Sequence, residues 1–216
     1  NMLASYNLQS SFSGFGFYNE ATPIIIGAVL AVLFAACILG GAKRLTNITG
    51  VLVPVMGIIY IIVAIIVVII NIRHVPGVFA NIFASAFDFK AIFGGFAGSA
   101  MMQGIKRGLY SNEAGMGSAP NAAATASTSH PVKQGLIQTL GVFTDTLVIC
   151  SATAFIILMS GVSLGGELDG VKLTQEALTA EIGGAGRIFV AIAIFFFAFS
   201  SIFGNYYYGE ANIRFI

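Results

Sequence analysis

The sequence predicts an all-α fold, a polytopic transmembrane helix bundle, and three observations lead to it. Of 216 residues, 57% are hydrophobic and 9% are charged, against about 25% charged in an average soluble domain. Several apolar runs reach the roughly 20 residues that a helix needs to cross a bilayer core about 30 Å thick. The 26 glycines and 19 phenylalanines, without any tryptophan, suit helices that pack through small residues and present aromatic bulk to lipid. We therefore expect the protein to lie in a lipid bilayer.

Three apolar runs predict membrane-spanning helices by length and hydrophobicity alone. They are residues 24–42, 51–72 and 136–160. A fourth run, 187–208, begins at Arg187 and ends in a tyrosine cluster, which suits the headgroup level of a bilayer. These runs supply most of the expected bundle.

Asp145 stands inside the otherwise apolar run 136–160, between two threonines. An ionised carboxylate is costly inside a membrane, so an aspartate there is a candidate functional residue by default. Pairing with a basic residue, contact with an ion, proton coupling and a structural hydrogen bond all remain open for it.

The pattern changes after residue 76. Segment 77–90 places apolar residues at helical spacing with polar residues among them, which predicts an amphipathic, extracytoplasmic helix too short to span. Residues 92–110 are a weaker, glycine-rich fifth span. If all five runs alternate in direction, the basic residues of the short loops share one side: Lys43, Arg44, Lys106, Arg107 and Lys133. The positive-inside rule makes that side cytoplasmic, so the charges support the weak span.

Glycines in the weak span allow two interpretations. Gly94 and Gly98, then Gly104 and Gly108, lie four residues apart, as in closely packed helices. The alternative is a helix broken in mid-membrane, between about Phe93 and Gly104. Irregular backbone is tolerated there only where it is buried in protein or lines a cavity.

The stretch GIKRGLYSNEAGMGSAPNAAATA, residues 104–126, interrupts the apolar pattern. Lys106 and Arg107 suit a helix C-terminus at the cytoplasmic face. A glycine-containing turn follows, and then Ser118 and Pro120 favour the start of another helix. The local pattern is therefore helix, tight turn, helix, and a plain connecting hairpin is the simplest interpretation of it.

The run from Gly104 to Pro120 resembles the signature of the sodium:alanine/glycine symporter family. The resemblance continues through residues 130–155 and 196–212. This family is similar to leucine-transporter-type secondary transporters, which have two inverted five-helix repeats and discontinuous helices. The resemblance implies that residues 1–216 are a fragment of one transmembrane transporter domain with part of that fold, from about its fourth to its eighth span.

The function implied by the resemblance is sodium-coupled symport of a small neutral amino acid, alanine or glycine, into the cell by alternating access. The location implied is the cytoplasmic membrane of a bacterium or archaeon. A proton-coupled or facilitative carrier of the same architecture, or an ion channel, are the alternatives. The sequence leaves open the preference between alanine and glycine.

Site residues also follow from the resemblance. The discontinuous sixth span of that architecture lines the substrate pocket, and it maps here onto Gly94, Gly95, Phe96, Ser99 and Gln103. Exposed N–H groups at a half-helix N-terminus can hold a carboxylate there. Small residues leave room for a small side chain.

A pair of hydroxyl residues in the eighth span of that architecture implies that Ser200 and Ser201 bind sodium, a hard cation that prefers oxygen ligands. A serine within a span more often bonds a carbonyl of its own helix. The resemblance also implies a role in gating or in the architecture of the loop for the signature residues, which are Arg107, Ser111, Asn112, Glu113, Gly115 and Gly117.

Enzyme functions find no support in the sequence. The Gly-x-Ser-x-Gly, phosphate-loop and His-Glu-x-x-His motifs are absent. We expect no catalytic residues, no cofactor beyond the coupling ion, no nucleic-acid partner and no particular protein partner. Cys37 and Cys150 both lie in apolar runs and are predicted to be buried.

Overall fold

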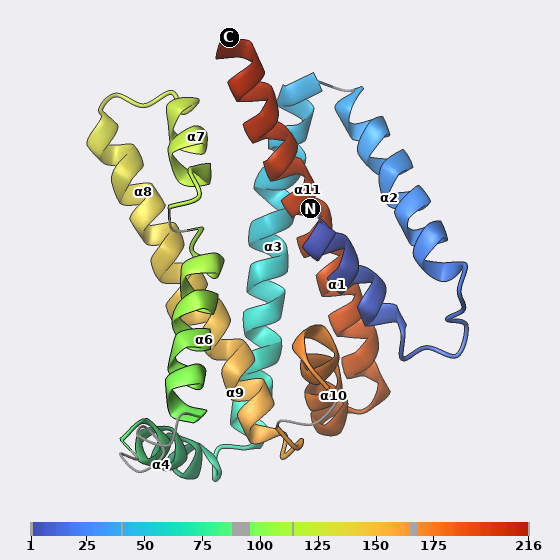
Figure 1. Cartoon of the computed structure of the whole chain (residues 1–216), viewed down its shortest axis with the longest axis vertical. Coiled ribbons are helices and arrows are strands. Elements are labelled where there is room, and N and C mark those ends of the chain that lie inside the picture. Colours follow the sequence, from blue (N-terminus) through green and yellow to red (C-terminus); the bar gives the residue numbers. More distant parts are fainter. Residues whose placement is uncertain (1, 40, 88–95, 114, 165–167, 216) are drawn as a thin grey trace.

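The chain is described by a computed structural model that covers residues 2–39, 41–87, 96–113, 115–164 and 168–215, with the side chains of 41–46, 96–100 and 214–215 excepted. Every regular element in these ranges is a helix, which confirms the predicted all-α class (Figure 1). In chain order they are α1 (Met2–Phe12), α2 (Thr22–Ile38), α3 (Gly41–Ile70), α4 (Val75–Ala86), α6 (Phe96–Ser111), α7 (Ser118–Ala124), α8 (Pro131–Phe143), the π-helix η1 (Thr144–Cys150), α9 (Ser151–Met159), α10 (Gly170–Ile182) and α11 (Gly184–Phe215).

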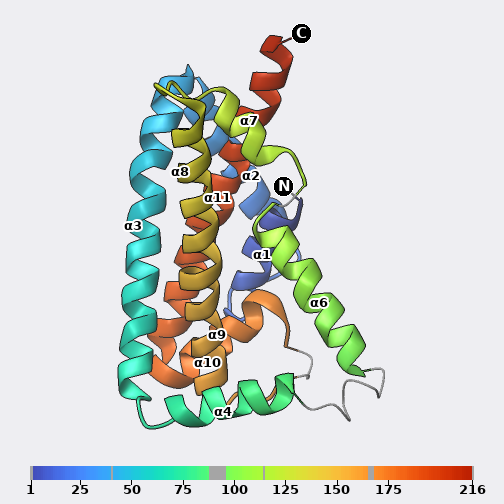
Figure 2. The ribbon, with the colours of Figure 1, turned by 90° about the vertical axis from the view of Figure 1, so that its left-hand side faces the viewer.

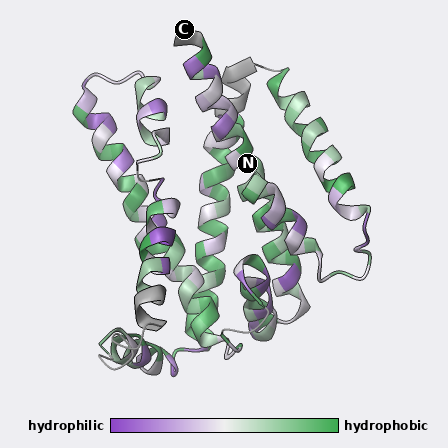
Figure 3. Ribbon diagram, viewed as in Figure 1, coloured by the Kyte–Doolittle hydropathy of each residue, from purple (hydrophilic) through white to green (hydrophobic). Residues whose placement is uncertain are grey.

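Within the described residues, three helical rods are long and apolar enough to cross a membrane. They comprise Asn47–Ile70, Pro131–Met159 and Gly184–Ile213, with 24, 29 and 30 residues. Hydrophobic residues make up much of these rods, as Figure 3 shows, and many side chains on α3, such as Ile58, are exposed. An exposed row of isoleucines suits contact with lipid rather than water. Of the shorter predicted spans, 24–42 overlaps the 17-residue helix α2, which ends at Ile38, and its crossing of the membrane stays a prediction.

Two hydrophobic clusters fix α11 in the centre of the structure. One joins α11 to α3, α9 and α10 around Tyr60, Val67, Ile156 and Leu178. The Tyr60 hydroxyl also lies 2.7 Å from the hydroxyl of Thr153, which links α3 to α9. The other joins α11 to α1 and α2; its buried residues are Leu8, Leu30, Ala198, Phe199 and Phe203. Because α11 packs on both sides, the residues near its middle are held in place.

The connection between α9 and α11 folds back onto the bundle as α10. The Arg187 guanidinium joins three segments there: it donates to the Gly14 carbonyl oxygen at 3.1 Å and to Glu176 at 3.0 Å. Buried Gln175 donates to the Ser11 carbonyl oxygen at 2.9 Å. These bonds tie α1, α10 and the start of α11 together.

Helix α4 lies across the ends of the long helices, as Figure 2 shows. It covers most of the amphipathic segment predicted at 77–90, of which 88–90 lie outside the described residues. The helix begins at Val75, after the N-cap residue His74, and Pro76 lies in its first turn, where proline is well tolerated. Attachment of α4 to a membrane surface stays a prediction.

The position predicted for the helix break is wrong within the described residues. Residues from Phe96 to Ser111 form the regular helix α6, so the backbone is not irregular between Phe96 and Gly104. A glycine costs a helix only about 1 kcal/mol, and the alanine, methionine and glutamine residues around Gly98 and Gly104 favour it. Residues 93–95 lie outside the described part. The interruption that the structure does describe comes later, between α6 and α7.

Candidate functional site

The turn from Asn112 to Gly117 separates α6 from α7, and its backbone is unusual. Gly115 and Gly117 have φ angles of 76° and 84°, and Glu113 has a φ of 50°. Glycine adopts such angles freely, but a residue with a Cβ does so at a cost of about 1–2 kcal/mol. Among the described residues, Glu113 is the one non-glycine with positive φ. A residue held in this way is a candidate for function.

Ser200 and Ser201 lie on α11 opposite this turn. Both hydroxyls donate to the carbonyl oxygen of Phe197, at 2.9 Å each. The expected alternative for a serine in a span, a bond to its own helix, is therefore present. Such a bond uses the hydroxyl proton and leaves the oxygen lone pairs able to accept or to bind a cation.

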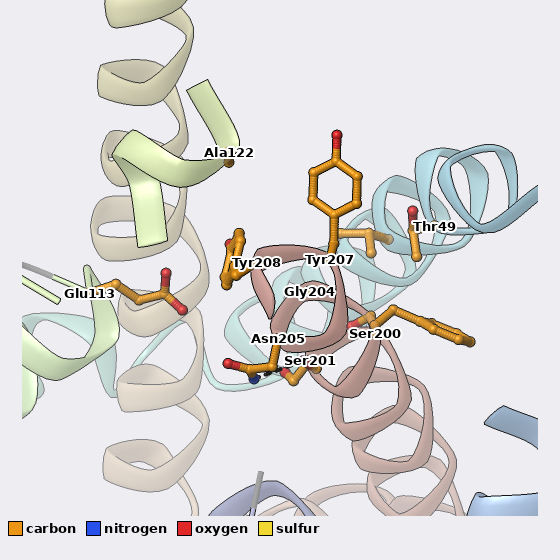
Figure 4. A pocket seen from close by; sticks show the side chains of 11 residues that line it. Thr49, Glu113, Ala122, Ser200, Ser201, Gly204, Asn205, Tyr207 and Tyr208 are labelled. Atoms are coloured by element: carbon orange, nitrogen blue, oxygen red, sulfur yellow. Dashed lines mark hydrogen bonds between the residues drawn. The ribbon is translucent and has the colours of Figure 1, made fainter. Parts of the chain in front are cut away.

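The turn and the serine pair line one cavity of about 450 Å³, which we name the α11 pocket. Figure 4 shows Glu113 pointing from the turn toward α11, which carries most of the lining. The polar lining residues are Thr49, Glu113, Ser200, Ser201, Asn205, Tyr207 and Tyr208. The pocket thus brings hydroxyl, amide and carboxylate oxygens together between α3, the turn and α11.

Two further cavities meet the α11 pocket at Glu113. The α1 pocket, of about 400 Å³, lies between α1, the turn and α11, and shares Glu113, Ser201 and Asn205 with the first. The η1 pocket, of about 180 Å³, is lined by Glu113 together with Asn112, Asp145 and others. Glu113 therefore lines all three cavities.

The chemistry of this arrangement suits a monovalent cation and an amino acid. Carboxylate, amide and hydroxyl oxygens are the donors that hard cations prefer. A carboxylate also attracts an ammonium group. Glu113 supplies the negative charge, and Ser200 and Ser201 supply neutral oxygens.

The structure brings some predicted site residues together and separates others. Glu113, Ser200 and Ser201 share one pocket. Ser111 and Asn112 lie beside it and bond to η1. Gly115 and Gly117 form the turn.

Other predicted residues lie elsewhere. Arg107 and Gln103 are exposed on α6 and line none of the three pockets. Gly94 and Gly95 lie outside the described residues, as do the side chains of Phe96 and Ser99. A role of this segment in substrate binding stays a prediction.

Several pocket residues were missed by sequence reasoning. Ser201, Asn205 and Tyr208 recur at intervals of four and three, which places them on one face of a helix. That spacing is a signal from which Asn205 and Tyr208 could have been found. Thr49 comes from a separate helix and carries no comparable signal.

Cys150 is exposed and Cys37 is half-buried, so the predicted burial is wrong for Cys150. An apolar run indicates that a residue lies in a membrane helix. It does not indicate whether the residue faces protein or the surroundings.

Apolar rods of membrane-spanning length, with a cavity between them that is lined in part by side-chain oxygens, define a helical membrane protein. The chain belongs to the sodium:alanine symporter family, whose sequence model matches residues 1–216. This membership confirms the resemblance found in the signature. It also confirms the expectation of a multi-pass membrane transporter rather than an enzyme.

Individual relatives agree with this assignment. The amino-acid carrier protein AlsT of Bacillus subtilis is 56% identical over 197 residues, which are 91% of this chain and 42% of the relative. The probable sodium/glutamine symporter GlnT of the same species is 49% identical over 97% of the chain and 44% of the relative. The sodium/alanine symporter AgcS of Methanococcus maripaludis is 43% identical over 90% of the chain and 43% of the relative. The chain thus spans less than half the length of these relatives.

Proposed function

We propose that the protein is a sodium-coupled symporter that imports a small neutral amino acid, alanine or glycine, by alternating access. The observation that carries the proposal is the α11 pocket, where the strained Glu113 faces Ser200 and Ser201. Membership of the sodium:alanine symporter family supports it. The turn between α6 and α7 then serves as the break of a discontinuous helix in a leucine-transporter-like repeat.

In this proposal, sodium binds to the hydroxyl oxygens of Ser200 and Ser201. The hydroxyl protons point to the Phe197 carbonyl oxygen, so the lone pairs are directed away from it and toward the ion. Glu113 balances the charge of the cation or of the substrate ammonium group. Sodium and substrate are coupled because both favour the same conformation, and each therefore raises the affinity for the other.

The substrate proposal is alanine or glycine, and glutamine is the second candidate. The name of AgcS supports alanine, and the name of GlnT, which is 49% identical to the chain, supports glutamine. Uptake of labelled alanine, glycine and glutamine by proteoliposomes that contain the full-length protein separates them. Saturable uptake of alanine or glycine, with glutamine excluded, is the result we expect.

The sodium ligands are tested by the double variant Ser200→Ala/Ser201→Ala. We expect the sodium concentration for half-maximal alanine uptake to rise at least about tenfold, because two oxygen ligands are lost at about 1 kcal/mol or more each. Thr139→Val is the matched control: its hydroxyl also bonds only to its own helix, at 3.0 Å from the Gly135 carbonyl oxygen, and it lines none of the three pockets.

Unchanged sodium dependence in the serine variant would remove these residues from the sodium site. Uptake that is equal in sodium and choline, already in the unmodified protein, would instead favour a proton-coupled or facilitative carrier. Conductance without saturation at low substrate concentration would favour a channel.

A further inference from the structure

The long rod from α8 to α9 changes its winding in the middle. Residues Thr144–Cys150 form the π-helix η1, with wider turns than the α-helices on either side. Short π-helical segments within α-helices occur frequently at functional sites. Here η1 contains Asp145, the carboxylate whose role the sequence leaves open, and it contacts the end of α6.

Two adjacent residues of η1 bond to two adjacent residues at the helix break. The Ser111 hydroxyl donates to Asp145 Oδ2 at 2.5 Å. The Thr146 hydroxyl donates to Asn112 Oδ1 at 2.8 Å. Ser111 is the last residue of α6, and Asn112 is the first residue of the turn. We name this pair of bonds the η1–turn contact.

The π-helical winding also groups the side chains around Asp145. In an α-helix, residues five apart point about 140° away from each other, because each residue turns by about 100°. In a π-helix, where residue i bonds to residue i+5, residues five apart lie about one turn on and on a similar face. Cys150 is thus 3.9 Å from Asp145 and 3.6 Å from the Ser111 hydroxyl. Residue 145 therefore meets Ser111 in a small polar cluster rather than standing alone.

The η1–turn contact acts on the residue next to Glu113. Asn112 is held on both sides, since its Nδ2 donates to the Gly108 carbonyl oxygen at 3.0 Å while its Oδ1 accepts from Thr146. The backbone of Glu113 follows directly, with a φ of 50° that is unfavourable without support from its surroundings. Glu113 and Asp145 both line the η1 pocket.

We propose that Asp145 and Thr146 are positioning residues for transport. Through Ser111 and Asn112 they hold the break so that the Glu113 carboxylate stays in the α11 pocket. They bind neither sodium nor substrate themselves. This inference rests on the proposed function, because it concerns the same pocket.

The test compares Thr146→Val with Thr144→Val in the full-length protein. Both variants replace a threonine of η1 by the same apolar residue. Thr144 bonds only to its own helix, 2.9 Å from the Leu140 carbonyl oxygen, whereas Thr146 bonds to the turn. We expect Thr146→Val to raise the sodium concentration for half-maximal alanine uptake about fivefold, the factor that one ordinary hydrogen bond represents. Thr144→Val leaves it unchanged, and the maximal rate changes little in either variant.

Asp145 provides a second, independent test. Asp145→Asn keeps an oxygen that accepts from Ser111 and retains near-normal sodium affinity, whereas Asp145→Leu lacks it and loses affinity. In the Asp145→Leu background, the further change Ser111→Ala has little additional effect, because the bond is already gone. Equal losses in Asp145→Asn and Asp145→Leu would contradict positioning and favour a role of the charge itself.

A measurement that does not depend on transport separates this inference from the proposed function. Hydrogen exchange of the backbone amides between residues 112 and 117 should be faster in Thr146→Val than in Thr144→Val. Equal exchange and equal sodium affinity in the two variants would overturn the inference, even if the unmodified protein is sodium-dependent. If the exchange were faster in Thr146→Val but uptake by the unmodified protein did not depend on sodium, the η1–turn contact would stand and the proposed function would be overturned.

Discussion

At the scale of single residues, Glu113 links the backbone of the break to the chemistry of the pocket. Its φ of 50° is a conformation that glycine adopts more readily. Its side chain lines all three cavities between the turn, α11 and their neighbours. A glycine here would relieve strain but would remove the carboxylate, so function explains the presence of glutamate better than stability does.

Replacing Glu113 separates these two effects. We expect Glu113→Gly to be more stable than Glu113→Ala by about 1 kcal/mol, because alanine keeps the left-handed penalty. Both variants lose sodium affinity, since both remove the carboxylate. Thermal unfolding in detergent, together with uptake measurements, checks the prediction.

Glu210 is the matched control, because it lies within the regular helix α11. There the order should reverse, with Glu210→Ala more stable than Glu210→Gly by about 1 kcal/mol. The same order at both positions would mean that the backbone of Glu113 carries no left-handed strain.

The candidate site could be predicted from the sequence only in part. Ser200, Ser201 and Glu113 were singled out through the resemblance to the symporter signature and to the leucine-transporter architecture, and their roles stay predictions. Their presence in one pocket depends on how α11 packs against the turn, and no local sequence pattern predicts that packing. Asp145 was noticed as a charge within an apolar run, but its partner Ser111 depends on the π-helical winding.

At the scale of elements, the all-helical fold with long apolar helices was predictable, whereas the position of the break was not. Gly98, Gly104 and Gly108 within α6 allowed a break, yet their neighbours favour helix strongly enough to outweigh them. The described break lies where glycines combine with positive φ, at Gly115 and Gly117. A count of glycines does not distinguish these cases, because tertiary packing decides which glycines leave the helix.

The junction of α10 and α11 gives a prediction for the element scale. A Cβ added to Gly186 would lie 2.5 Å from the backbone carbonyl oxygen of Leu178, closer than packed atoms allow. We expect Gly186→Ala to lower the free energy of unfolding by about 1–3 kcal/mol, because the two helices must separate. Thermal unfolding of the purified protein measures the effect.

Gly184→Ala serves as the control for this junction. Gly184 also lies at the start of α11, but nothing stands within 4 Å of a Cβ added there. The control should be as stable as the original protein or slightly more so, since alanine favours helix. If both variants unfold at the same temperature, the close approach of α10 to α11 is not a feature of the protein.

At the scale of the whole molecule, α11 organises the structure and the candidate site alike. It packs on α3, α9 and α10 through one cluster and on α1 and α2 through the other. The oxygen-lined pocket lies along the same helix. Any movement of the α6–α7 break relative to α11 therefore changes the pocket, which is the coupling that alternating access requires.

The most direct test of this account is uptake of labelled alanine by proteoliposomes that contain the full-length protein, under an inward gradient of sodium or of choline. The account predicts that alanine accumulates above its external concentration only with sodium, and that accumulation collapses when a sodium ionophore removes the gradient. Equal uptake in sodium and in choline would contradict it.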